Sequence, residues 1–182
     1  MKISKITLLL ILSIILTSCV VSTAAKIVKT TAKVGIGLVK GTVKGVAWTV
    51  KKAEGKIDED RIDGTWKVVG VYNGTYEQFA QDQNPENNFA TDCAAGVEVI
   101  EFKSKRSKFK PVHCDSTDED WIKYQYDFGK NPQTKEKENY LKYNSSNYIS
   151  IIDVTSKTMV LEGNLMQKYA FSGGKLYLFE KK

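Results

Sequence analysis

The chain carries three thiols and one imidazole, the side chains best suited to covalent chemistry. Cys19 lies near the N-terminus, Cys93 lies near the middle, and Cys114 directly follows the single histidine, His113. A cysteine–histidine nucleophile pair needs a free thiolate within reach of the imidazole. Adjacent residues of a strand point to opposite faces, so His113 and Cys114 are poorly placed for that chemistry. The sequence has no triad motif, phosphate-binding glycine loop or zinc motif, and we expect no enzyme, no cofactor and no metal site.

Cys19 has the setting of a lipid-attachment site. Lys2 and Lys5 precede an apolar run over 6–16 that is too short to span a bilayer. The order Leu-Thr-Ser-Cys at 16–19 resembles the processing site of bacterial lipoproteins. That resemblance implies a signal peptide over 1–18 and a lipid anchor (diacylglycerol and a fatty acid such as palmitate) on Cys19. Because Val20 rather than Asp follows the cysteine, it also implies the outer membrane, facing the periplasm. The alternative is a signal peptide followed by an incidental cysteine.

Export bears on the two remaining thiols. In an oxidising compartment, Cys93 and Cys114 are expected to form a disulfide. Its loop of about 20 residues predicts about 3 kcal/mol of stabilisation. Metal binding is the alternative, but two cysteines and one histidine make a poor site. The acidic residues between 115 and 120 lack the spacing of a calcium loop, and we interpret them as a solvated turn.

The net charge of +6 is unevenly distributed along the chain. Residues 20–57 hold eight lysines and one glutamate, whereas residues 58–182 hold 17 basic and 20 acidic side chains. A basic segment therefore precedes a mildly acidic domain, and only the first part is expected to meet an anionic partner. For an exported chain, an anionic membrane or cell-wall surface is a better match than nucleic acid.

The basic segment, 19–56, has a regular lysine pattern. On a helical wheel, six lysines fall within about 60° of arc, and apolar residues fill the other sides; they are Lys26, Lys29, Lys33, Lys40, Lys44 and Lys51. This pattern predicts an amphipathic helix over 24–52 lying in a membrane interface. Gly37, Gly41 and Gly45 also fit a helix that packs against another helix, although glycine and the β-branched residues are poor helix formers. A loosely ordered spacer is the third reading.

A short polar stretch, 57–62, is interpreted as a linker before a β-rich domain over 63–182. Alternating apolar and polar residues, separated by glycine- and asparagine-rich turns, predict about nine antiparallel strands joined by short connections. These runs cover residues 65–72, 96–103, 108–114, 121–128, 138–143, 148–154, 158–162, 165–171 and 175–181. The expected fold is all-β, an up-and-down meander that removes exposed edges by closing on itself, with a helical turn near 76–79.

The domain resembles bacterial lipocalin-like proteins. The opening run Gly-Thr-Trp-Lys-Val at 64–68 is similar to the Gly-x-Trp start of lipocalins, the two cysteines flank a similar hairpin, and 149–161 resembles a later one. The resemblance implies a lipocalin-like β-barrel in which Trp66 closes one end. The alternating run at 122–128 suggests a lumen face, formed by Ile122, Tyr124, Tyr126 and Phe128. The opposite parity would instead turn Trp121 and Gln125 inward.

Two functional classes remain after this reading. The first is a membrane-anchored barrel that binds a small apolar ligand or lipid. The second is a protein-binding, inhibitory or structural module whose barrel is filled by its own side chains. The lysines between 103 and 110 are interpreted as a solvated face in either case.

Overall fold

The computed structural model describes residues 39–43, 46–90, 97–114, 120–165 and 174–182. The chain divides into two units, 1–35 and 36–182, and all described residues belong to the second. Cys19, Lys26, Lys29, Lys33 and Gly37 lie outside the described residues, so the predicted anchor remains a prediction. No helix in the described ranges is long and apolar enough to cross a membrane.

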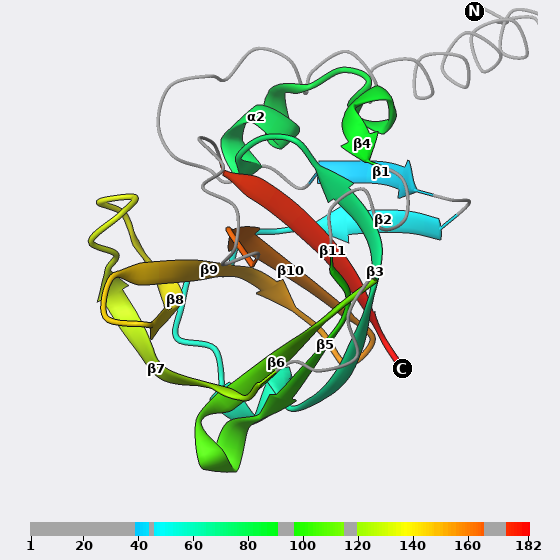
Figure 1. The fold of residues 1–182 in the computed structure, drawn as a ribbon. Helices are drawn as coiled ribbons and strands as arrows, with labels where there is room; N and C mark the ends of the chain where they lie inside the picture. The colour runs from blue at the N-terminus through cyan, green and yellow to red at the C-terminus, as the bar shows by residue number, and fades with distance from the viewer. Residues whose placement is uncertain (1–38, 44–45, 91–96, 115–119, 166–173) are drawn as a thin grey trace, which may run out of the picture. The chain divides into compact units, whose positions relative to one another are not determined.

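Eight strands form a closed antiparallel barrel (Figure 1). Each strand pairs with the next along the chain, and the last pairs with the first. The strands are β3 (Gly64–Tyr72), β5 (Val97–Lys103), β6 (Lys108–His113), β7 (Ile122–Lys130), β8 (Lys137–Tyr143), β9 (Asn147–Val154), β10 (Thr158–Gly163) and β11 (Lys175–Lys181). The two-residue strand β4 (Phe89–Ala90) also pairs with β3. The predicted fold class, an all-β antiparallel up-and-down barrel, is confirmed.

The turns between strands follow the predicted signals. Between β8 and β9, Asn144 and Ser145 have φ values of 43° and 65°, in the left-handed region that suits a tight hairpin turn. The helical turn predicted near 76–79 is α2 (Tyr76–Gln81), where Thr75 and Gln78 form a reciprocal capping box. The strand predicted over 165–171 lies almost wholly outside the described residues.

Two apolar clusters lie on opposite sides of the barrel wall. Side chains that point inward form the interior cluster, which includes Trp66, Phe102, Phe109, Leu141, Ile151 and Phe179. Outward-pointing side chains of β3, β9, β10 and β11 form a second cluster with α2 and the end of β2; it includes Tyr72, Phe79, Ile152, Val160 and Leu178. The outer face of this half of the barrel is therefore covered by α2 and the end of β2.

The amphipathic helix predicted over 24–52 is wrong for its described part. Residues 39–43 and 46–50 form two antiparallel strands, β1 (Val39–Val43) and β2 (Val46–Val50), in which Lys40 is paired with Thr49. Valine and threonine favour extended backbone, and Gly41 removes helix propensity. The lysine spacing was therefore a weaker signal than the β-branched composition. Lys44 and Gly45 lie outside the described residues.

The stretch predicted to be a linker, 57–62, packs into the barrel instead. It contains the 3-10 helix η1 (Glu59–Ile62), and Ile57 and Ile62 are buried in the interior cluster. Asp63 follows η1 and accepts hydrogen bonds from the backbone N–H and hydroxyl of Ser104, in η3 (Ser104–Arg106). A third such helix, η2 (Pro85–Asn88), precedes β4. The polar residues of this stretch thus cover two buried isoleucines at one end of the barrel.

Candidate functional site

The barrel interior is lined by aromatic rings that touch one another. The rings of Phe102 and Phe109 lie 5.7 Å apart, centroid to centroid, and Phe109 lies 5.4 Å from Tyr143. Tyr124 lies 6.1 Å from Phe102 and 6.2 Å from Phe109. The four rings come from four consecutive strands, β5 to β8. Such edge and tilted contacts stabilise the wall beyond the burial of its area.

Tyrosine hydroxyls are the main polar groups on this wall. The Tyr143 hydroxyl donates to the Asn164 carbonyl at 2.6 Å. The hydroxyls of Tyr124 and Tyr177 are buried and form no well-aligned hydrogen bond with the described residues, although the Glu59 carboxylate lies beside Tyr124 and the Leu165 backbone lies beside Tyr177. The Oε1 atom of Glu59, whose carboxylate lies near Tyr124, is also buried and unpaired there. The interior thus holds polar atoms whose hydrogen-bonding capacity is unused.

Burial sets the protonation of these tyrosines. It raises the pKa values of Tyr143 and Tyr177 to about 12. It also raises the pKa of Tyr124, and the nearby Glu59 carboxylate adds to that rise. All three hydroxyls are therefore protonated at neutral pH, and each is able to donate a hydrogen bond.

A hydrogen-bonded network closes one end of the interior. The Tyr126 hydroxyl donates to the Asn139 side-chain oxygen at 2.7 Å and approaches the Ile57 carbonyl at 2.5 Å. Asn139 also accepts from the Ile57 N–H at 2.9 Å, and its amide donates to the Gly55 carbonyl at 2.8 Å. Asn139 is fully buried, and its amide satisfies backbone groups that would otherwise lack partners. The segment 55–57 is thereby fixed across the barrel.

Trp66, predicted to close one end of the barrel, is fully buried in β3. Its indole Nε1–H donates to the Ile62 carbonyl at 2.8 Å, which joins β3 to η1. The Lys181 ammonium lies over the ring, 5.0 Å from its centroid. The tryptophan thus belongs to the interior cluster and also contacts the end of β11. Its role as a plug remains a prediction.

Three of the four predicted lumen residues face inward. Tyr124 belongs to the interior cluster, and Ile122 and Tyr126 pack against it. Phe128 is not part of that cluster; the Lys137 ammonium lies 5.1 Å from its ring. Gln125, which the alternative assignment placed inside the barrel, is exposed. The strand therefore faces inward with Ile122, Tyr124 and Tyr126, as first predicted. Ligand contact by these residues remains a prediction.

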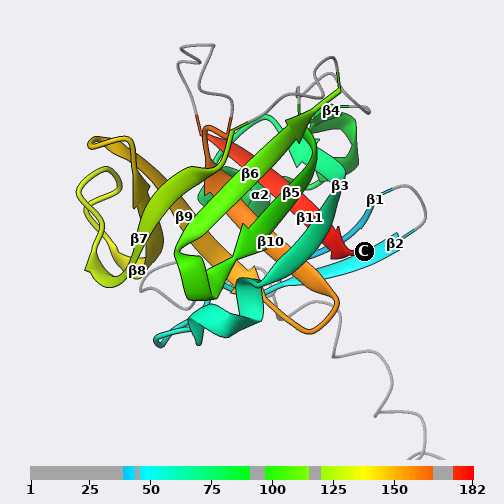
Figure 2. The same ribbon diagram turned by 60° about the horizontal axis from the view of Figure 1, so that its bottom comes forward.

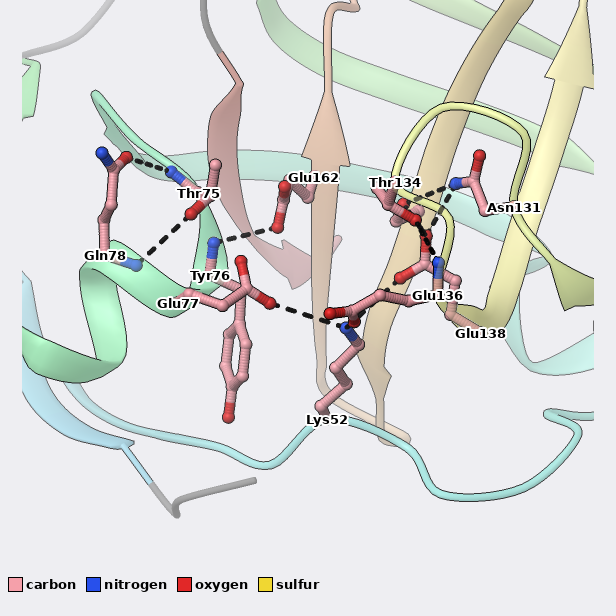
Figure 3. Close-up of polar contacts among 11 residues, drawn as sticks. Lys52, Thr75, Tyr76, Glu77, Gln78, Asn131, Thr134, Glu136, Glu138 and Glu162 are labelled. Atoms are coloured by element: carbon pink, nitrogen blue, oxygen red, sulfur yellow. Dashed lines mark hydrogen bonds and ion pairs between the residues drawn. The ribbon is translucent and has the colours of Figure 1, made fainter. Parts of the chain in front are cut away.

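A polar cluster on the outer face of the barrel was missed by the sequence analysis (Figure 3). Lys52, just after β2, is buried with its ammonium 2.5 Å from Glu136, 3.3 Å from Glu138 and 3.6 Å from Glu77. The second oxygen of Glu138 accepts from Asn131 at 2.7 Å, and also from Thr134 and Ser150. Burial opposes the charge on Lys52, but the hydrogen bond to Glu136 and the surrounding carboxylates outweigh it and raise the pKa of Lys52.

Glu162 joins α2 to the barrel beside this cluster. Its carboxylate accepts from the Tyr76 N–H at 2.9 Å, at the first residue of α2. Burial raises the pKa of Glu162 to about 7, and the neighbouring carboxylates of Glu77 and Glu138 contribute to the rise. The only sequence signal for this region was the presence of Glu138 and Asn139 in a strand whose neighbours are apolar.

The predicted cysteine chemistry is only partly described. Cys93 lies outside the described residues, so the Cys93–Cys114 bridge remains a prediction. No group of three or more histidine, cysteine or acidic side chains in the described ranges is placed to hold a metal ion.

Comparison with known proteins gives a likeness of fold only. The sequence matches no family model and no curated protein. Bovine odorant-binding protein in complex with its natural ligand is similar, with 15% identity and a TM-score of 0.35 over 72% of this chain and 77% of the other. Its complexes with a selenium-containing odorant and with undecanal each show 14% identity and a TM-score of 0.34, with the same coverage. The functional argument therefore rests on the side chains of this chain.

Proposed function

We propose that the chain is a lipid-anchored envelope protein whose barrel binds a small, mainly apolar ligand with one polar end. The observation that carries this proposal is the pair of buried hydroxyls on Tyr124 and Tyr177, which form no well-aligned hydrogen bond with the described residues of an apolar interior. A buried polar group without a partner costs about 1–3 kcal/mol. A ligand whose polar end accepts from either hydroxyl would remove that cost, and its apolar part would contact the aromatic wall.

A second candidate function has its own supporting observation. The ring contacts among Phe102, Phe109, Tyr124 and Tyr143 fill space between four strands. An eight-stranded barrel is just wide enough to be filled by side chains or to hold one small ligand. The dense ring packing favours a rigid module that binds a protein partner through its outside. The two candidates predict opposite results for ligand binding.

A displacement titration separates the two candidates. A fluorescent apolar probe is bound to the protein and then displaced by a long-chain alcohol or by the alkane of equal length. We expect Tyr177→Phe to weaken displacement by the alcohol about fivefold, the value of one hydrogen bond, and to leave the alkane unaffected. Tyr140→Phe is the matched control, because Tyr140 is on β8 and its hydroxyl bonds Asp127 instead. Failure of the probe to bind at all would refute ligand binding and favour the second candidate.

The anchor rests on Cys19 and is tested separately. The Leu-Thr-Ser-Cys order at 16–19 supports acylation of this thiol after removal of 1–18. We expect Cys19→Ala to abolish incorporation of a radiolabelled fatty acid and to leave the unprocessed chain in the cell. Persistent labelling of the variant would refute the anchor without bearing on what the barrel binds. Sucrose-gradient fractionation then tests whether the labelled protein reaches the outer membrane.

A further inference from the structure

The outer face of β5, β6 and β7 gathers basic residues around one tryptophan. Outward-pointing Lys103, Lys108 and Lys110 all lie over the Trp121 ring, with their Nζ atoms 4.2, 4.5 and 5.5 Å from its centroid. Lys123 is paired with Lys108 on the neighbouring strand. We call these five residues the Trp121 face. Figure 2 views the β5–β6 part of this face, and no described strand or helix is drawn in front of it.

The tip of the same hairpin extends the positive charge. Lys105 and Arg106 are exposed in η3 and, with Lys103 and Asp63, line a shallow hollow of about 270 Å³. Asp63 is engaged by the N–H and hydroxyl of Ser104. Six of the 17 basic side chains between 58 and 182 therefore lie on this face or its tip, in a segment that is net acidic.

This concentration of charge opposes folding in isolation. Lys108 lies directly opposite Lys103 on one side and Lys123 on the other. Like charges that face each other across strands are destabilising. Among the described residues, the carboxylates beside these lysines are those of Glu101, which pairs with Lys103 at 3.4 Å and lies opposite Lys110, and of the exposed Asp120 before Trp121. Asp60 and Asp63 lie at the hairpin tip, where both accept from Ser104. An anionic partner that neutralises the lysines would relieve this repulsion.

We propose that the Trp121 face docks on an anionic phospholipid surface, with lipid phosphates at the lysines and at the hollow of the hairpin tip. The indole in the middle of the lysines favours this occupant over an acidic protein or a nucleic acid. Tryptophan is enriched at the headgroup level of membranes, and lysine stems extend their ammonium groups towards the phosphates. Each lysine near such a surface strengthens binding about fivefold. The inference is independent of what the barrel holds.

Quenching of Trp121 fluorescence by brominated lipids tests the docking. The full chain is reconstituted in vesicles of brominated phosphatidylcholine, either alone or with roughly one quarter phosphatidylglycerol. The signal of Trp121 is the difference between the protein and its Trp121→Phe variant, which removes the contributions of Trp48 and Trp66. We expect Trp121 to be quenched in the anionic vesicles only, and the quenching to be lost in about 0.5 M salt, where charges are screened.

Charge reversal provides a matched pair of variants. The triple variant Lys103→Glu, Lys108→Glu and Lys110→Glu is expected to weaken docking by about a hundredfold or more and to abolish the quenching. The control reverses three exposed lysines elsewhere, Lys130, Lys135 and Lys142, which changes the net charge equally. Both variants are checked for unchanged circular dichroism.

Three results would overturn the proposal. They are equal quenching in neutral and anionic vesicles, no quenching in either, and equal loss of quenching in the two triple variants.

Discussion

Replacing Lys52 by methionine should strongly destabilise the fold, although this residue lies outside the barrel interior. Its side chain is 8% exposed and that of Glu138 is 3% exposed, so this ion pair is shielded from water. At their separation of 3.3 Å, an effective dielectric of about 20 gives roughly 5 kcal/mol of attraction. Desolvation of both charges offsets part of this attraction, and the other two carboxylates are half exposed.

The net effect follows from which charge is left behind. Lys52→Met keeps an unbranched apolar stem but removes the ammonium group, and so leaves Glu138 buried without its cation. Breaking a buried pair in this way costs about 3–5 kcal/mol, and we expect about 3 kcal/mol here because Glu77 and Glu136 remain solvated. The double variant Lys52→Met with Glu138→Gln should recover at least about 1 kcal/mol, since the amide is uncharged and still accepts hydrogen bonds.

Urea unfolding of the chain from residue 20 onward, followed by circular dichroism, measures these differences. The adjacent Lys51 is the control, because its ammonium pairs with Glu54 at 3.4 Å and both side chains are largely exposed. Lys51→Met should change the unfolding free energy by less than about 1 kcal/mol. Equal effects of the two lysine variants would refute the reasoning, as would a double variant no more stable than Lys52→Met.

Three further predictions follow from the described contacts. The pKa of Glu162 is raised to about 7 in the folded protein, so the folded state binds this proton more tightly than the unfolded state does. The resulting contribution to the unfolding free energy is complete below about pH 4.5 and is lost as pH rises through about 7. Glu162→Gln should therefore flatten the pH dependence of the unfolding free energy between about 5 and 8. Tyr177→Phe should leave the free protein as stable as before or about 1 kcal/mol more stable in thermal unfolding, because a buried hydroxyl without a well-aligned hydrogen bond is removed; a clear loss of stability would indicate that the Leu165 backbone is an effective partner for that hydroxyl. Cys93→Ala with Cys114→Ala should lower the unfolding free energy by about 3 kcal/mol, and two thiols titrated in the folded, periplasm-expressed protein would refute the bridge.

The strand pattern of the barrel could be predicted from the sequence because it is local information. Alternation in 122–128 and turn residues such as Asn144 specify where strands begin, end and face. The helical turn expected near 76–79 was likewise found, as α2. Closure of β11 on β3 follows from the preference against exposed edges.

The N-terminal part was mispredicted because two local signals conflicted. Lysine spacing indicated a helix, whereas valine and threonine favoured strands and glycine disfavoured a helix; over 39–43 and 46–50 the second signal was decisive. The linker was misread because only two isoleucines of 57–62 are apolar, and the burial of Ile57 and Ile62 depends on a barrel formed by later residues.

The polar cluster could not have been predicted from local patterns. Lys52 and Glu136 are 84 positions apart, and their contact depends on where the segment after β2 crosses the barrel. The Trp121 face could not be predicted from local patterns either, because its lysines come from three strands. A run of lysines over 103–110 indicated only a solvated hairpin, and the position of Trp121 among them required the fold.

The central claim is that the barrel interior holds a small ligand. The most direct test is native mass spectrometry of the full protein after its release from membranes in mild detergent. We predict a bound molecule in the protein peak, mainly apolar with one polar end, that organic extraction removes. Its occupancy should fall in the double variant Tyr124→Phe with Tyr177→Phe and be unchanged in Tyr140→Phe. A protein peak at the mass of the lipidated chain alone, together with no binding of an apolar probe, would contradict the claim.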